Sequence, residues 1–250
     1  MNSQIQQAAM ALISARSSVA LTGAGISVES GIPPFRGKGG LWEQIDPMKY
    51  AHIDAYERNP AEVWEVLFMR LRDVLEKAEP NDGHLGLYRL ETMGLLQCIV
   101  TQNVDGLHQQ AGSKDVIEFH GTFASHHCTT CGQSVGWHHV NLAHLPPKCP
   151  CGGILRPDVV MFGEIIPMDR LQRAQMLAST CDVMMVVGTS ATVEPAAYLP
   201  FIAKRAGATI IEINPEPTPL TRQVSDITLL GKAGRIMREL LEAVKQIRND

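Results

Sequence analysis

The sequence lacks any run of 18 or more apolar residues, so it contains no candidate transmembrane helix. Its first eleven residues are polar with helical spacing, unlike the basic flank and apolar segment of a signal peptide. A formal net charge of only -4 gives no overall attraction to nucleic acid or to an anionic membrane. We therefore expect a cytoplasmic protein, acting as a monomer, with no membrane and no direct nucleic-acid partner.

Cysteine is scarce and unevenly placed. Four of the six cysteines lie within residues 128–151, whereas Cys98 and Cys181 stand alone inside apolar runs. A secreted disulfide framework would distribute its cysteines more evenly. This distribution excludes such a framework and favours a reducing compartment and a metal site.

The clustered cysteines form two close pairs separated by 17 residues. Two such pairs suit a closed tetrahedral thiolate site for one structural zinc ion, which takes no part in chemistry. The predicted zinc ligands are Cys128, Cys131, Cys149 and Cys151. Two alternatives stay open at this point: the four cysteines are free or redox-active, or His126 or His127 replaces one of the ligands. The histidines farther along, His138, His139 and His144, are interpreted as solvated.

Short apolar runs alternate with segments of helical spacing along most of the chain. This pattern is typical of a parallel sheet covered on both faces. With 250 residues, of which 45% are hydrophobic, the chain suffices for one large domain and a smaller insertion. We predict an α/β fold: a Rossmann-like doubly wound sheet with a smaller zinc-ribbon plus helical domain. The predicted strands of the large sheet cover residues 18–22, 98–101, 116–119, 182–187, 209–213 and 226–230.

Three segments interrupt the alternation. Residues 31–50 are rich in glycine and proline and predict a long ordered loop; residues 60–94 predict two helices, the first opened by Asn59 and Pro60. Residues 123–155 hold the clustered cysteines. We therefore divide the chain into a Rossmann-like domain (1–34, 91–122 and 156–250), a loop and helical module (35–90) and a zinc-binding module (123–155).

A glycine-rich turn follows the first predicted strand. Gly23-Ala-Gly-Ile-Ser27 before a helix start can present backbone N–H groups to a pyrophosphate. The dehydrogenase fingerprint would place Gly or Ala at position 28, where this chain has Val28, so hydride transfer loses most of its support. The loop beyond carries Phe35 and Arg36, which can shield a reactive sugar carbon and pair with phosphate.

Polar residues follow the ends of several predicted strands. Because ligands of open parallel sheets bind outside the carboxyl ends of the strands, these residues should face one crevice. Asn103 and Asp105 can hold an amide group, and His120 is suited to taking a proton from a sugar hydroxyl. Ser190 and Asn214 are placed to hydrogen-bond a ribose.

Taken together in their order, these motifs resemble the sirtuin family over nearly the whole chain. They are Gly23-Ala-Gly-Ile-Ser27, Gly31-Ile-Pro-Pro-Phe-Arg36, Thr101-Gln-Asn-Val-Asp105, His120-Gly121, the four cysteines, Phe162-Gly-Glu164 and Gly188-Thr-Ser190. The resemblance, to a bacterial or archaeal member, implies an NAD-dependent protein lysine deacylase that consumes NAD. In that reaction the acyl-lysine oxygen attacks the ribose carbon, and free lysine, nicotinamide and O-acyl-ADP-ribose are released.

The resemblance also implies roles for individual residues. His120 would be the general base, and Asn103 the second catalytic residue. The peptide would add as a strand between two loops, so the expected substrate contacts are Val160, Met161, Phe162, Gly163, Val193 and Glu194. The expected NAD contacts are Gly23, Ala24, Gly25, Ile26, Ser27, Pro34, Phe35, Arg36, Trp42, Gln102, Asn103, Val104, Asp105, Gly188, Thr189, Ser190, Asn214, Pro215, Glu216 and Ala233.

The sequence departs from the family pattern at two places. Family members that remove succinyl groups carry Tyr and Arg three residues apart on a helix, where this chain has Leu67 and Arg70. A spacing of three places both on one α-helical face, so we expect weak desuccinylation and a preference for neutral acyl groups. Arg70 can also be a solvated helix arginine. Pro34 replaces the usual Asp or Thr of the loop.

Two other functions are compatible with parts of the sequence. Mono-ADP-ribosyl transfer to proteins uses the same chemistry with a different acceptor. A zinc-ribbon nucleic-acid-binding protein is less well supported, because residues 123–155 contain only Lys148 as a basic side chain and lack a stacking platform.

Overall fold

A six-stranded, all-parallel sheet forms the centre of the larger lobe in the computed structural model, which describes residues 3–35 and 39–249. Its order is β3-β2-β1-β7-β8-β9. The strands are β1 (Ser18–Thr22), β2 (Cys98–Thr101), β3 (Val116–Glu118), β7 (Val183–Val187), β8 (Thr209–Asn214) and β9 (Ile227–Leu230). They lie within one or two residues of the predicted strands, and the predicted Rossmann-like class is confirmed.

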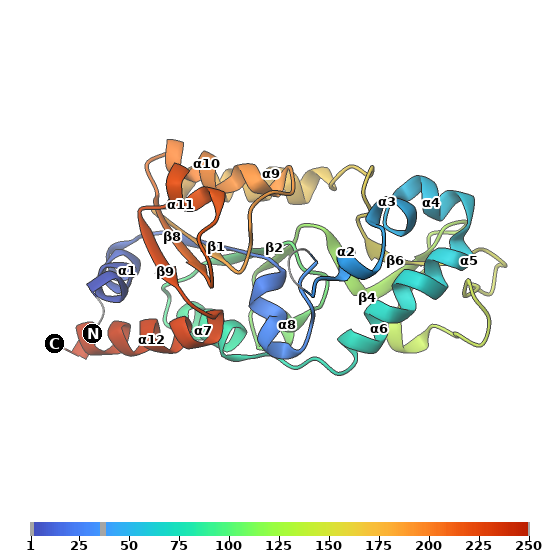
Figure 1. The fold of residues 1–250 in the computed structure, drawn as a ribbon, viewed down its shortest axis with the longest axis horizontal. Coiled ribbons are helices and arrows are strands. Elements are labelled where there is room, and N and C mark those ends of the chain that lie inside the picture. Colours follow the sequence, from blue (N-terminus) through green and yellow to red (C-terminus); the bar gives the residue numbers. More distant parts are fainter. Residues whose placement is uncertain (1–2, 36–38, 250) are drawn as a thin grey trace.

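Helices cover both faces of this sheet (Figure 1). One face packs against α1 (Ser3–Ser14), α7 (Asp82–Thr92) and α12 (Ala233–Asn249). The opposite face packs against α9 (Met168–Thr180), α10 (Leu199–Arg205) and α11 (Pro219–Gln223). Alternate residues of a strand serve the two layers: in β1, Ala20 joins the first cluster and Val19 and Leu21 the second. This double burial explains the continuous apolar runs.

The parallel register brings the strand ends to one edge. Thr22 is level with Thr101 in β2 and Val187 in β7, and Val187 is level with Ile213 in β8. Chain order reverses between β1 and β7, which is the position where doubly wound sheets bind ligands. The loops that follow β1, β2, β7 and β8 therefore converge there, where the sequence places its polar motifs.

A smaller lobe lies beyond this edge, at the right of Figure 1. It combines a three-stranded antiparallel sheet, β5-β4-β6, with short helices, and Trp64, Phe68, Phe123 and Met161 are buried together in its core. The sheet consists of β4 (Gly121–Cys128), β5 (Ser134–Gly136) and β6 (Leu155–Val159). The helical elements are α2 (Leu41–Gln44), α3 (Pro47–Tyr50), α4 (Ile53–Arg58), α5 (Pro60–Val63), a π-helical turn (Trp64–Phe68) and α6 (Met69–Leu75).

The prediction of an uninterrupted loop over residues 31–50 was wrong in its second half, which holds α2 and α3. The reason is local capping: the Asp46 side chain accepts the Met48 N–H, and Pro47 occupies the first turn of α3. The Asn59 cap was predicted correctly, because its side chain accepts the Glu62 N–H at the start of α5.

Four short elements complete the fold: α8 (Leu107–Gln110) and three 3-10 turns, Ala24–Ser30, Trp137–His139 and Ala196–Tyr198. No helix within the described ranges is both long and apolar enough to cross a membrane. The three-part division of the chain stays a proposal. Strands β4 and β6 run across its boundaries near residues 122 and 155, so the zinc-binding sheet extends a few residues beyond them.

Candidate active site

A hydrogen-bonded triangle lies at the edge where β1 and β2 end. The Ser27 hydroxyl donates to Asp105 Oδ2 at 2.7 Å and accepts from Asn103 Nδ2 at 3.0 Å. Asn103 Nδ2 also donates to the Gly23 carbonyl at 3.2 Å. Burial raises the pKa of Asp105, and hydrogen bonds from the Leu107 N–H and from Ser27 oppose that rise. The structure thus gathers three of the expected contacts around one hydroxyl.

One acceptor in this group of residues, Asn103 Oδ1, can bind a ligand that carries N–H or O–H groups. Asn103 is only 4% exposed, and its Oδ1 has no hydrogen-bond partner among the described residues. A buried acceptor without a partner costs free energy, which a bound donor would recover. The carboxamide and ribose hydroxyls of NAD offer such donors, so these residues fit the nicotinamide riboside half of that molecule.

A buried histidine behind the triangle was not predicted. His84 Nδ1 accepts the Asn81 N–H at 3.2 Å, so its Nε2 carries the proton and donates to Ser27 Oγ at 3.3 Å. Burial lowers the pKa of His84 to about 4, which keeps the ring neutral. Because His84 Nε2–H donates to Ser27 Oγ, the Ser27 hydroxyl donates its own proton to Asp105. The signal in the sequence was the capping position of His84, three residues after Asn81.

His120 follows β3 at the same edge. Its Nδ1 lies 3.1 Å from the Gln102 carbonyl oxygen, which can only accept, so Nδ1 carries the proton and Nε2 is the basic nitrogen. Burial lowers the pKa of His120, and the bond to Gln102 opposes that effect. The ring is therefore neutral at neutral pH, as a general base requires.

This protonation state predicts the pH dependence of turnover. Only the neutral imidazole can take a proton, so activity falls as the pH falls through the pKa of His120. Because that pKa lies below the ordinary value of 6.5, we expect the acid limb of kcat/KM to have its midpoint below pH 6.5. Initial rates between pH 5 and 9 measure it. A midpoint above pH 7 would contradict this assignment.

The glycine turn packs tightly against the loop after β7. The N–H groups of Gly23 and Gly25 donate to the carbonyls of Val187 and Gly188 at 3.2 and 2.7 Å. A Cβ on Gly25 would come within 2.6 Å of the Gly188 oxygen. The Ile26 N–H donates to the Gly23 carbonyl at 3.1 Å, so all three amides are engaged within the protein, and a pyrophosphate contact from this turn stays a prediction.

The expected contacts further along the edge are held by side-chain amides. Gln102 Nε2 donates to Thr189 Oγ1 at 2.9 Å, and Asn214 Nδ2 donates to the Thr189 carbonyl at 3.0 Å. Ser190, Pro215 and Glu216 are exposed beside them, whereas Ala233 is buried at the start of α12. Val104 packs into the smaller lobe.

An aromatic row connects the glycine-rich loop with the expected peptide loop. The rings of Phe35 and Trp42 stack with centroids 5.3 Å apart, and Trp42 lies 6.2 Å from Phe162. The Trp42 N–H donates to the Phe35 carbonyl and the Leu41 N–H to the Pro34 carbonyl. Trp42 thus lies between half-buried Phe35 and Phe162 of the expected peptide loop. Arg36 lies outside the described residues.

The two expected peptide loops differ in burial. In residues 160–163 Met161 is buried, Val160 and Phe162 are half-buried and Gly163 is exposed. In the second loop, Val193 is half-buried and Glu194 is exposed. Glu194 Oε1 accepts a hydrogen bond from the Tyr198 hydroxyl at 2.8 Å. The contacts of these loops with a peptide stay predictions.

The structure gives Leu67 and Arg70 different burial, and their contact with an acyl group stays a prediction. Leu67 is 3% exposed inside the core of the smaller lobe, whereas Arg70 is exposed. Leu67 belongs to the π-helical turn Trp64–Phe68, which winds more residues per turn than an α-helix and so changes the direction of the next side chains. Sequence spacing alone assumes an α-helix throughout.

The four clustered cysteines meet in space. Their Sγ atoms all lie within 4.8 Å of one another, with Cys128 and Cys151 3.5 Å apart and Cys131 and Cys149 3.8 Å apart. Thiolates on a tetrahedral zinc ion with Zn–S bonds of about 2.3 Å stand about 3.8 Å apart. Gly153 has to lack a side chain, because a Cβ there would lie 2.5 Å from Cys128 Sγ. The site fits zinc closely.

Neither neighbouring histidine replaces a cysteine. The fully buried His126 ring lies between Trp64 and Trp137, with centroids 5.7 and 5.4 Å away. His127 Nδ1 bonds to the Asp158 carboxylate. The exposed His138, His139 and His144 agree with the interpretation of solvated residues. All four ligand positions therefore belong to cysteine, and the structural zinc prediction is confirmed.

A doubly wound sheet with a ligand crevice at its switch point and an attached zinc module defines the class: a nucleotide-binding α/β protein with a structural metal. The model of the Sir2 family matches residues 23–195. This chain belongs to that family, as the motifs indicated. An NAD-dependent protein deacylase 2 of Pyrobaculum aerophilum is 48% identical over 236 residues, 94% of each chain.

Solved structures agree with this assignment. The crystal structure of a Sir2 homologue bound to NAD has a TM-score of 0.89 at 45% identity and covers 97% of this chain and 94% of its own. The structure of Sir2Af2 bound to a myristoylated histone peptide has a TM-score of 0.84 at 37% identity, covering 100% and 99%.

Proposed function

We propose that this protein removes acyl groups from lysine side chains of proteins at the carboxyl edge of its sheet, consuming NAD. The chain is an enzyme of the Sir2 family, and relatives of nearly equal length are NAD-dependent protein deacylases. The observation that carries the proposal is the neutral, backbone-anchored His120 next to the buried triangle of Ser27, Asn103 and Asp105. A generic nucleotide-binding fold does not need that arrangement.

The proposed roles follow from the hydrogen bonds. NAD supplies a ribose carbon whose bond to nicotinamide breaks, and transfer of the acyl group to the ribose requires proton removal from a hydroxyl. His120 Nε2 takes that proton, since Nδ1 is held by the Gln102 carbonyl. Asn103 Oδ1 accepts from the ligand, and its Nδ2 is fixed by Ser27 and Gly23. Phe35 shields the reacting carbon from water.

Substrate docking is proposed to use the backbone of residues 160–163 and 193–196. Main-chain pairing with an extended peptide tolerates many side chains, which suits a deacylase with several protein substrates. A relative has been solved with a myristoylated histone peptide, which supports an acylated peptide as the partner. The nucleotide half would contact the expected residues from Gly23 to Ser27 and from Gly188 to Ser190.

We propose a cytoplasmic monomer as the working form. A zinc site of four thiolates needs reduced cysteines, which a reducing compartment maintains. Direct nucleic-acid binding is not favoured, because the zinc module offers one lysine and Trp137 is covered by Arg72, 5.3 Å from its ring.

The test of the function is a product assay. Incubation with NAD and an acetyl-lysine peptide should yield deacetylated peptide by mass spectrometry, and omission of NAD should prevent this. ADP-ribose appearing on protein while the peptide stays acetylated would support mono-ADP-ribosyl transfer instead. An NADH-dependent absorbance change without deacetylation would support a dehydrogenase.

Acyl selectivity is a separate prediction. Leu67 is apolar and buried and Arg70 points to solvent, so a succinyl carboxylate would meet little compensation in this helix. We expect acetyl and butyryl peptides of matched sequence to be cleaved about tenfold faster in kcat/KM than the succinyl peptide, with weak desuccinylation remaining. Competition assays measure the ratio. A succinyl rate equal to or above the acetyl rate would refute the preference.

A further inference from the structure

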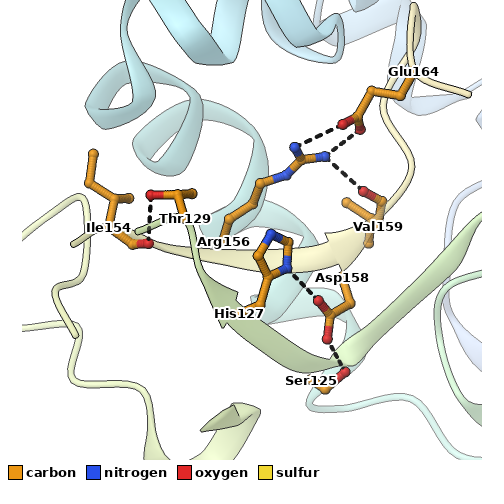
Figure 2. Close-up of polar contacts among 8 residues, drawn as sticks. All are labelled: Ser125, His127, Thr129, Ile154, Arg156, Asp158, Val159 and Glu164. Atoms are coloured by element: carbon orange, nitrogen blue, oxygen red, sulfur yellow. Dashed lines mark hydrogen bonds and ion pairs between the residues drawn. The ribbon is translucent and has the colours of Figure 1, made fainter. Parts of the chain in front are cut away.

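An arginine–glutamate pair braces the loop that the peptide is proposed to use. Arg156 lies in β6, and Glu164 closes the loop eight residues later (Figure 2). Arg156 Nη1 donates to Glu164 Oε1 at 2.9 Å, and Nη2 donates both to Glu164 Oε2 and, at 3.0 Å, to the Val159 carbonyl. One guanidinium thus binds both ends of residues 159–164.

The carboxylate also acts on the loop backbone. Glu164 Oε2 accepts the Met161 N–H at 2.8 Å, while the Glu164 N–H donates to the Met161 carbonyl at 3.1 Å. Gly163 has φ of 86°, and a Cβ there would lie 2.7 Å from His52 Nε2. The pair and the glycine together specify one shape for this turn.

The braced loop is joined to the catalytic residue at its other end. The Val160 N–H donates to the His120 carbonyl at 2.8 Å. On the outer side, Phe162 exchanges backbone hydrogen bonds of 2.9 Å with Ala51 and Ile53. The position of residues 160–163 relative to His120 is therefore determined by a short path of backbone and ion-pair contacts.

The pair is ionised and largely shielded from water. Burial alone would raise the pKa of Glu164, but the hydrogen bonds from Arg156 and from the Met161 N–H outweigh it and lower the pKa. Arg156 is 9% exposed, its guanidinium lies 5.3 Å from the Tyr56 ring, and its Nε has no partner among the described residues. Removing the Glu164 charge would leave the buried Arg156 charge unpaired, and removing Arg156 would leave the partly exposed Glu164 carboxylate with the Met161 N–H, so the loop would rearrange.

We propose that Arg156 and Glu164 are positioning residues for the acylated peptide: they hold residues 160–163 in the peptide-accepting shape and at a fixed distance from His120. This role rests on the proposed deacylation. Neither side chain needs to touch the peptide, because both act through the loop backbone. The effect should therefore be larger on the peptide than on NAD, because most of the expected NAD contacts lie on the sheet edge, although Trp42 packs against Phe162 of the loop.

The neighbouring network in Figure 2 has a different task. Asp158 accepts from Ser125 Oγ and bonds to His127 Nδ1, and both partners come from β4. These contacts connect β4 with β6 and leave the loop backbone untouched. The exposed pair of Arg173 and Asp115, in which Arg173 Nη2 donates to both carboxylate oxygens at 2.6 Å, connects α9 with the residue that precedes β3 and offers a control of the same charge type.

Steady-state kinetics of the zinc-loaded protein test the role. Glu164→Gln and Arg156→Met should raise the KM for an acetyl-lysine peptide by about tenfold and leave the KM for NAD within about twofold. Arg156→Lys should have a peptide KM between those of Arg156→Met and the unsubstituted protein, because lysine keeps the charge but cannot donate from two nitrogens as arginine does. Arg173→Met should match the unsubstituted protein. Zinc content and Tm identify any variant that misfolds, and the isosteric Glu164→Gln guards against that outcome.

The outcomes separate the two claims. If Glu164→Gln deacylates with an unchanged peptide KM, or if the KM values for peptide and NAD rise equally, the positioning role is overturned and the function stands. If the unsubstituted protein shows no NAD-dependent deacylation, the proposed function fails, and this role fails with it.

Discussion

Removal of zinc should abolish deacylation while the six-stranded sheet stays folded. The cluster around the cysteines buries few apolar residues, namely Cys128, Cys149 and Leu155 with Val135 and Val140 packed against them. Structural zinc supplies about 10–16 kcal/mol of apparent binding free energy in small domains, so the module depends on its ion. The larger lobe has two apolar layers that do not involve the cysteine cluster.

The module's position explains why activity should be lost with it. Strand β4 begins directly after His120, and β6 leads into residues 160–163. Cys128→Ser, or chelation, should give stoichiometric zinc loss, rapid amide exchange in β4 to β6 and no measurable turnover. Cys181→Ala, a buried cysteine outside the cluster, should retain zinc. Full activity in zinc-free protein would refute the scaffold role.

Substitution of His120 by alanine should lower kcat by about 10²–10⁴-fold, the usual contribution of a general base. The Nδ1–H of the His120 ring donates to the Gln102 carbonyl, so Nε2 is unprotonated and can accept a proton. NAD binding should be nearly unchanged, because the expected nucleotide contacts lie in other loops. His138→Ala, an exposed histidine, is the matched control. A His120→Ala variant within threefold of the unsubstituted rate would remove His120 from the mechanism.

The central sheet was predictable because its strands are buried on both faces. Double burial produces continuous apolar runs such as residues 183–187, which stand out in the sequence. Parallel register then forces the strand-end motifs, including Asn103 and His120, to one edge. The zinc site was predictable for a related reason: thiolate pairs at short spacing have few other structural explanations.

Other features depend on contacts that sequence spacing does not encode. The π-helical turn at Trp64–Phe68 could not be predicted, because its residue types suit an α-helix. The Arg156–Glu164 pair is formed across a loop. It fixes the loop because the two side chains also bind the Val159 carbonyl and the Met161 N–H. His84 is connected to the site through Ser27, 57 positions away, and only the packing of α7 against the glycine turn reveals it.

Product stoichiometry is the most direct test of NAD-consuming deacylation at this edge. With an acetyl-lysine peptide and NAD, the zinc-loaded protein should form free-lysine peptide, nicotinamide and O-acetyl-ADP-ribose in equal amounts, and His120→Ala should suppress all three together. Deacetylated peptide without nicotinamide release, or nicotinamide release with ADP-ribose attached to protein and the peptide intact, would contradict the account.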